Sequence, residues 1–346
     1  MSDIKINSPV SGTLDAGAPA ESFQNDPLLP VSVAGLLLWA AAMTMALAAV
    51  LLAPVASFVF LLAGFGLAHV LAEMRFIDAR FSTRATRPLW HVILGGIAGI
   101  ALTRLLFILG WIAYAPAVGI EVGIGIVLAA GVAALAPRHR LPLFIGLIAF
   151  AALAIGSPIH ALLVVALLHN LTPLAFIAEA VPPGERRRIV LFLLVPFVLL
   201  PLFIASGAGH GLLEGSGLQP SLWAPQEAGP PERYFSAFLP AWSFGEAWAI
   251  DVFAAAVFAQ AMHYLAVIVV MPRLQPRFGG GTALPWPQGR LFWLAIAGVS
   301  LALLAVYSVD YALARQLYAL AAAMHSWLEV PLLVLLAGSA LKPTSA

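Results

Sequence analysis

Long apolar segments separated by short polar turns make up most of the chain from residue 31 onward. An α-helix needs about 20 apolar residues to cross ~30 Å of hydrocarbon. By this measure the sequence predicts about ten transmembrane helices in an all-α bundle, with eight or nine as the alternatives, because one segment is short and Pro54 alone separates the first two. The predicted spans are residues 31–53, 55–74, 89–113, 117–136, 141–156, 159–181, 189–208, 247–271, 291–314 and 316–341.

Polar segments flank and interrupt this single predicted transmembrane domain, which covers residues 31–341. Residues 1–30 are rich in Ser, Pro, Gly, Asp and Asn, and we expect them to form a disordered cytoplasmic tail, not a secretory signal, which would begin with basic residues. Residues 342–346 form a second short cytoplasmic tail. The proline- and aromatic-rich residues 209–245 predict an outer loop that caps the bundle at the membrane interface, and residues 272–290 predict a flexible inner loop.

The composition is that of a membrane protein. Hydrophobic residues make up 62% of the chain and charged residues 10%, whereas about a quarter of a soluble domain is charged. A net charge of +1 argues against a nucleic-acid partner, which requires a concentrated basic face. The chain has no cysteine, which excludes disulfides, thiolate-bound metals, iron–sulfur clusters and covalent haem attachment through CxxCH. The expected surroundings are membrane lipids.

The distribution of basic residues predicts the orientation of the chain. With the N-terminus inside, 14 of the 17 Lys and Arg residues lie in inner segments, Arg233 and Arg315 lie outside, and Arg104 lies within a span. This bias is the one that the positive-inside rule describes, and it requires an even number of spans with both termini inside. We therefore expect an N-in, C-in protein of a bacterial cytoplasmic (inner) membrane.

Four histidines interrupt four different predicted spans. Counted from the inner end of each span at 1.5 Å per residue, they lie roughly 8 to 24 Å deep, mostly between the inner face and the midplane. Ionisable groups at this depth are costly and are by default read as functional. Independent packing histidines would have no reason to share one side of the bilayer, so we expect these four to form one buried centre. They are His69, His169, His263 and His325.

Two of these histidines have a glutamate one helical turn later. Glu73 follows His69 and Glu329 follows His325, so each pair shares a helix face. Glu329 is too deep to reach water, and it must be paired, protonated or bound to a cation. Glu73 lies near the inner end of its span, where an interfacial ion pair with Arg75 is the alternative interpretation.

Prolines next to these polar residues predict bent helices. Pro173 has no N–H to donate to the carbonyl of His169, so the helix should bend there and leave that carbonyl without its usual partner. Pro331 should similarly loosen the helix beside Glu329. Freed carbonyls and kinks are common where a site is built within a membrane.

Imidazole and carboxylate groups together are ligands for iron, zinc, copper or manganese. The chain contains no HxxH, HxxxH or HxxHH spacing, so it does not match the histidine-box desaturases and hydroxylases. We predict a transition-metal centre, with iron as the first choice, in which His69, His169, His263 and His325 are ligands and Glu329 is a ligand or a catalytic base. Further residues expected beside the centre or its substrate are Glu73, His91, Arg104, Asn170 and Gln260.

Three functions are compatible with such a centre. The first is a membrane-bound metal-dependent enzyme, an iron oxygenase or oxidoreductase that acts on a lipid-soluble small molecule and draws on a redox partner. The second is a b-type haem protein for electron transfer or haem processing, in which two of the histidines would clamp the haem iron. The third is a proton-coupled transporter with His325, Glu329 and Arg104 as its relay.

Overall fold

The structure is a computed structural model that describes residues 33–135, 139–223, 229–275 and 282–338. The two predicted tails and a short part of each long loop lie outside the described residues. The described residues form helices and loops and include no strand. The α-helices are α1 (Val33–Leu52), α2 (Pro54–Phe81), α3 (Arg87–Ile108), α4 (Tyr114–Leu135), α5 (Arg140–Gly156), α6 (Pro158–His169), α7 (Thr172–Ala180), α8 (Pro183–Leu194), α9 (Leu200–Ala205), α10 (Ala208–Gly215), α11 (Glu232–Phe235), α12 (Ala249–Leu265), α13 (Met271–Leu274), α14 (Gly289–Val309) and α15 (Tyr311–Ala337).

The lengths and composition of these helices are those of an integral membrane protein. Seven continuous helical segments in the described residues are long and apolar enough to cross a bilayer, and α6 with α7 makes an eighth if this bent pair is one span. The two remaining predicted spans fall on shorter apolar helices, α5 and the Leu37–Leu52 part of α1. The all-helical membrane bundle predicted from the sequence is thus confirmed, with seven to eight helices of spanning length.

Prolines interrupt three of the spans. Between α6 and α7 the chain bends by 40° just before Pro173, as the sequence predicts. A π-helical turn, Val195–Leu199, joins α8 to α9 and contains Pro196, and a second, Ala266–Val270, joins α12 to α13 just before Pro272. Each proline lacks the N–H that would close a regular α-turn. The helix α15 continues through Pro331 without a break.

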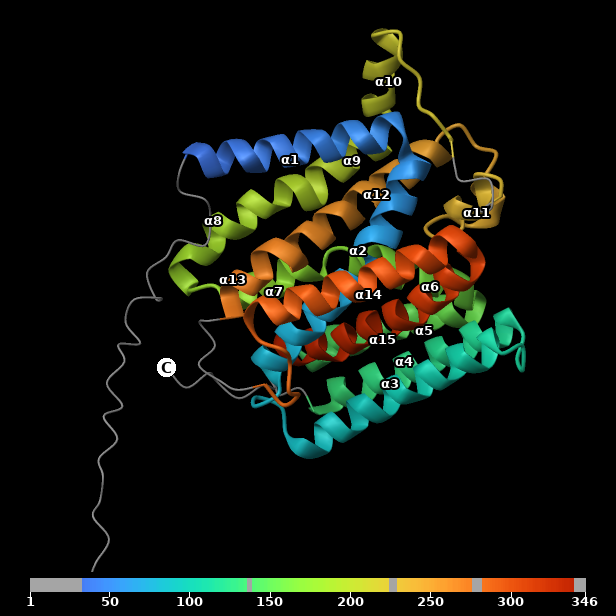
Figure 1. Cartoon of the computed structure of the whole chain (residues 1–346). Helices are drawn as coiled ribbons and strands as arrows, with labels where there is room; N and C mark the ends of the chain where they lie inside the picture. Colours follow the sequence, from blue (N-terminus) through green and yellow to red (C-terminus); the bar gives the residue numbers. More distant parts are fainter. Residues whose placement is uncertain (1–32, 136–138, 224–228, 276–281, 339–346) are drawn as a thin grey trace, which may run out of the picture.

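Helices α2 and α15 lie at the centre of the bundle. The other long helices surround them, and most of these have axes roughly parallel to one another (Figure 1). Helix α2 packs against α12, α14 and α15, and α15 also packs against α3 and α4. The outward faces carry large apolar side chains, such as Val127 (72% exposed), Ile155 (87%) and Leu38 (72%). In a membrane these faces contact lipid, whereas the inward faces of α2 and α15 pack against other helices.

Two glycines allow bulky side chains of α15 to reach its neighbours. A Cβ atom at Gly125 of α4 would lie 2.1 Å from the ring of Trp327, and one at Gly66 of α2 would lie 2.7 Å from the ring of Tyr318. No larger residue fits at either position without moving the ring. The contact at Gly66 brings α15 close to α2, which carries His69 and Glu73, and the contact at Gly125 brings it close to α4.

The outer loop expected to cap the bundle divides its aromatic residues between two environments. Phe238 is buried and packs edge-on against Phe58 of α2, and it also contacts Phe253 of α12. Trp223 and Trp242, by contrast, are 65% and 69% exposed. The loop therefore packs part of its aromatic residues against one end of the bundle, while Trp223 and Trp242 face the surroundings.

Candidate metal centre

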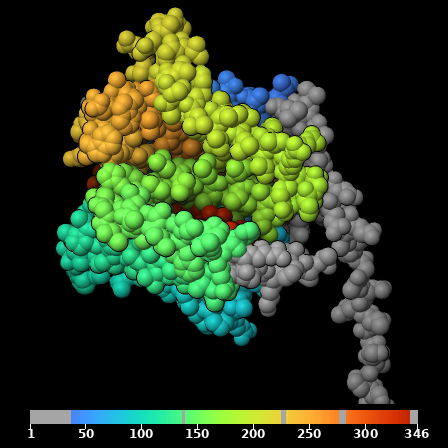
Figure 2. Space-filling view, turned by 180° about the vertical axis from the view of Figure 1, so that it is seen from behind, coloured from blue at the N-terminus to red at the C-terminus, as the bar shows by residue number. Residues whose placement is uncertain are grey.

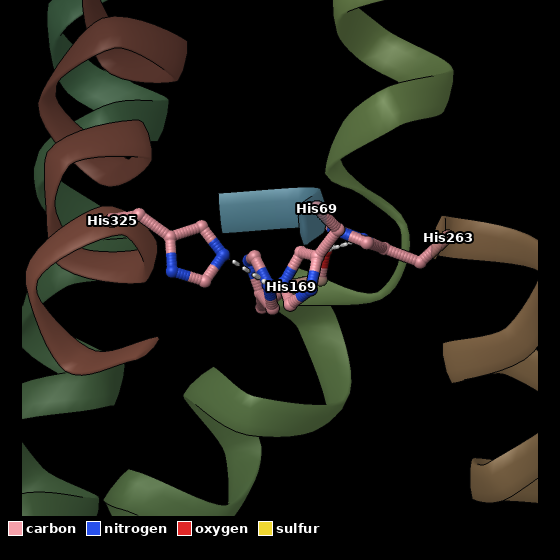
Figure 3. A group of neighbouring side chains, drawn as sticks. All are labelled: His69, His169, His263 and His325. Atoms are coloured by element: carbon pink, nitrogen blue, oxygen red, sulfur yellow. Dashed lines mark hydrogen bonds between the residues drawn. The ribbon is translucent and has the colours of Figure 1, made fainter. Parts of the chain in front are cut away.

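Four histidines from α2, α6, α12 and α15 meet in the interior of the bundle (Figure 3). The rings of His169 and His263 have centroids 4.4 Å apart, and those of His169 and His325 are 4.5 Å apart. His69, His263 and His325 have no exposed surface. One nitrogen from each of the four rings lies within 4.8 Å of the others, which is the spacing of ligands around one metal ion. The structure thus brings together all four ligands predicted from the sequence.

Backbone carbonyls hold three of the rings through their Nδ1 atoms. The partners are the carbonyl of His169 for His263 (3.1 Å), the carbonyl of Ala321 for His325 (3.3 Å) and the carbonyl of Phe65 for His69 (3.4 Å). A carbonyl can only accept, so each Nδ1 carries the proton and donates it. Each Nε2 atom is then left with a free lone pair, which is the usual state of a metal-binding histidine.

The carbonyl that holds His263 is the one freed by Pro173. Because Pro173 has no N–H, the carbonyl of His169 cannot accept a backbone hydrogen bond from it. It accepts instead from the hydroxyl of Thr172 at 2.8 Å and from Nδ1 of His263 at 3.1 Å. The bend in the sixth predicted span therefore has a direct role, because it supplies the anchor for a ligand from another helix.

A carboxylate holds the fourth ring. Nδ1 of His169 lies 2.7 Å from Oε2 of Glu329, and its Nε2 atom points toward Nε2 of His325 at 3.0 Å. At this distance an N–H···N hydrogen bond joins the two rings when one Nε2 atom carries a proton. With both Nδ1 atoms protonated instead, two lone pairs face each other, and a cation beside them would remove the repulsion. Two ligands at right angles on an ion, each about 2.1 Å from it, are also about 3.0 Å apart.

Glu73 completes the cluster. Its Oε2 atom lies 3.2 Å from Nε2 of His263 and 3.9 Å from Nε2 of His325, and its side chain has no exposed surface. The contact with His263 does not have hydrogen-bond angles, and both oxygens of Glu73 lack a donor. Glu73 does not form the interfacial ion pair with Arg75 that was the alternative interpretation. The guanidinium group of Arg75 donates instead to the side-chain oxygen of Gln288 at 3.3 Å.

Several polar atoms of the cluster have no partner within the protein. Four neutral imidazoles and two ionised carboxylates would carry two negative charges in a site closed to water, which is strongly unfavourable. A divalent cation would neutralise this charge and also provide the missing partner. The atoms without a hydrogen-bond partner are Nε2 of His69, Nε2 of His263, both oxygens of Glu73 and Oε1 of Glu329.

A pair of buried tyrosines orients the ring of His69. Tyr264 stacks on His69 with centroids 3.9 Å apart, and its hydroxyl lies 2.8 Å from the hydroxyl of Tyr318. Gln260, which we expected beside the centre, donates to the hydroxyl of Tyr264 at 2.7 Å. Neither tyrosine was among the residues expected at the site, although Tyr264 directly follows His263 and Tyr318 precedes His325 by two helical turns.

Arg104 has a partner away from the cluster. Its guanidinium group bonds to both oxygens of Glu121, at 2.5 and 3.0 Å, and Glu121 also accepts from the indole N–H of Trp327 at 2.9 Å. This pair joins α3, α4 and α15. Of the transport relay suggested by the sequence, His325 and Glu329 lie in the cluster, whereas the hydrogen bonds of Arg104 are with Glu121.

For two other residues expected near the centre, the structure gives a different hydrogen-bond partner or an exposed position. Asn170 is buried next to His169 in sequence, but its amide donates to the carbonyl of Ala166 at 3.3 Å. His91 is on the exposed surface of α3.

The fold and the site together define a class of protein: a helical membrane protein with a buried His/Glu cluster that is able to hold a metal ion. Comparison of the chain with protein-family models, with curated proteins and with solved structures finds no match. Its function is therefore inferred from the geometry of this centre.

Proposed function

We propose that the protein is a membrane-bound metal-dependent enzyme whose cofactor is held by His69, His169, His263 and His325, with Glu73 completing the site. One observation carries the proposal: one nitrogen from each of four histidine rings lies within 4.8 Å of the others in the interior of the bundle, while each Nδ1 atom is held by a carbonyl or a carboxylate. Packing histidines need no such common orientation. The arrangement is the one expected of ligands with their outer partners already in place.

Iron is the metal that we propose. Mixed imidazole and carboxylate donors suit iron, and more than four donors in one volume favour a higher coordination number than the tetrahedral geometry of structural zinc. The ring centroids of His69 and His169 are 6.4 Å apart, a spacing that two axial haem ligands could have. The rings of His263 and His325, however, lie 4.4 to 5.3 Å from both of them and occupy the space that a porphyrin would need. The donor set therefore supports a non-haem ion.

Glu329 occupies the position of a base or of an outer partner. Its Oε2 atom accepts from His169, while its Oε1 atom has no partner and can take up a proton. Bound iron would supply the one-electron and dioxygen chemistry of an oxygenase or oxidoreductase, with reducing equivalents from a redox partner. The surrounding helices would exclude water from the reacting groups.

Metal analysis of the purified protein tests this proposal. We expect about one equivalent of a transition metal per polypeptide after extraction from membranes, together with an absorption spectrum that lacks a Soret band. A Soret band would favour the haem alternative. Less than about a tenth of an equivalent of any transition metal, after expression with added iron, would remove the proposal.

We also propose that ten segments cross a bacterial cytoplasmic membrane with both chain ends inside, α1 and α5 being the two short spans. Because the chain has no cysteine, single cysteines can report on exposure to either side. A cysteine at Gln219, after α10, should react with a membrane-impermeant maleimide on intact spheroplasts. One at Thr83, between α2 and α3, should react only after lysis. The reverse pattern would contradict the proposed orientation.

A further inference from the structure

A cavity of about 340 Å³ lies beside the metal centre, between α4, α5, α6 and α15. This is the size range of small-molecule sites, about 300 to 1,000 Å³. His169 and Glu329 form part of its wall, so the cavity reaches the cluster directly. Its other walls are apolar or small residues, among them Ala129, Ala133, Gly146, Phe150, Val165 and Val330.

The polar groups in the wall are almost all occupied within the protein. Thr172 donates to the carbonyl of His169, Ser326 to the carbonyl of Ala322, and the indole of Trp327 to Glu121. The polar atom of the lining that lacks a partner is Oε1 of Glu329. The lining contains no Lys or Arg, so nothing in it would neutralise an anionic ligand.

The cavity opens on an apolar face of the bundle. In the space-filling view, red atoms of the C-terminal part of the chain are visible at the bottom of a hollow between green segments (Figure 2). The wall residue Leu168 is 57% exposed, and the neighbouring Ile145 and Ile148 of α5 are 58% and 66% exposed. Such a face lies among acyl chains, so a ligand would arrive from within the bilayer.

We infer that this cavity binds an uncharged, lipid-soluble molecule with a long hydrocarbon part, which enters sideways from the bilayer and places its reacting end against Glu329. The apolar wall favours hydrocarbon, and the lining has no Lys or Arg that would compensate the desolvation of an anionic group. The inference deepens the proposed function, and it depends on that function only for the reaction at the inner end.

Gly146 allows the cavity to be filled without touching the metal ligands. A Cβ atom at this position meets no atom within 4 Å, so Gly146→Phe should be accepted by the backbone and should place its ring in the cavity. Gly131 of α4 is equally open and is not part of the cavity wall. Gly131→Phe is therefore the matched control, with the same change of residue on a neighbouring helix.

Photolabelling of the full chain in lipid nanodiscs tests the inference. Two probes that carry the same diazirine-substituted chain are compared, a long-chain primary alcohol and the corresponding fatty acid, and the labelled residues are identified by mass spectrometry. We expect the alcohol to label wall residues such as Val330 and Val165, and the fatty acid to label them less. Gly146→Phe should lower wall labelling at least about ten-fold, because the ring occupies the space of the probe. Labelling of the lipid-facing Ile148 should not change.

The outcomes separate this inference from the proposed function. Wall labelling that is unchanged in Gly146→Phe, reduced equally in Gly131→Phe, or equally strong with the fatty acid would overturn the inference. Metal content is measured on the same samples. If no metal is found and the alcohol still labels the wall selectively, the proposed function fails and the cavity inference stands. If metal is bound but the alcohol does not label the wall selectively, the cavity inference fails and the proposed function stands.

Discussion

Replacing His263 by alanine should reduce the bound metal to less than about a tenth of an equivalent, the largest change expected from any single substitution. His263 is fully buried, and its Nε2 atom faces Glu73 while its Nδ1 atom is held by the carbonyl of His169. Loss of an outer partner already lowers metal affinity by about 10- to 100-fold, and loss of a direct ligand should cost more. His325→Ala should have the same effect, because its Nε2 atom faces the same point.

His160→Ala is the matched control for these variants. His160 lies at the start of α6, where its Nδ1 atom bonds to the hydroxyl of Ser157 at 2.6 Å, and it is not part of the cluster. Elemental analysis of the three variants, each checked for a single monomeric species by size-exclusion chromatography, gives the comparison. Retention of the full metal content in both His263→Ala and His325→Ala would show that the metal binds elsewhere.

Removal of the metal should lower the melting temperature of the wild-type protein by on the order of 10 °C. A ligand present at about 1,000 times its Kd stabilises the folded state by about 4 kcal/mol. Without the ion, Glu73 and Glu329 are left together in a site that excludes water. Glu73→Gln removes one of these charges, so without metal this variant should melt at a higher temperature than the wild type, although it binds metal less tightly.

Glu179→Gln provides the contrast. Glu179 also lies within the protein, but Arg80 and Arg84 bond to it at 2.7 and 2.8 Å, so its charge is already balanced. This variant should lose stability both with and without metal, and its response to a chelator should equal that of the wild type. Thermal unfolding in detergent, with and without chelator, measures all three proteins. A wild-type melting temperature that does not change on metal removal would argue against an ion in this centre.

The sequence was sufficient to predict the class of protein and the members of the histidine cluster. Apolar length identifies a membrane span because the thickness of the bilayer sets it, and each span can be recognised without its neighbours. A histidine within such a span is costly wherever the other helices lie. Similar depths on four spans then predicted that His69, His169, His263 and His325 would meet. The bend at Pro173 was predictable for the same reason, since a missing N–H is a local property.

The tertiary structure decided which side chains face one another. Glu73 could equally have turned toward Arg75 or toward the histidines, because a residue near a helix end can reach either environment. Tyrosines are common in apolar segments, so Tyr264 and Tyr318 do not stand out in the sequence. Only the packing of α2, α12 and α15 brings them beside His69. The apolar cavity also depends on four helices at once.

What the sequence predicts and what only the tertiary structure decides differ for one physical reason. Insertion into a bilayer is determined segment by segment, by the apolar surface and the hydrogen-bonded backbone of each helix, so the sequence alone determined that this protein is a helical membrane bundle with buried ionisable groups. The rotation of each helix about its axis depends on how side chains of several helices fit together. That fit brings one nitrogen of each of the four histidine rings together and leaves room beside Glu329, and it exists only in the assembled bundle.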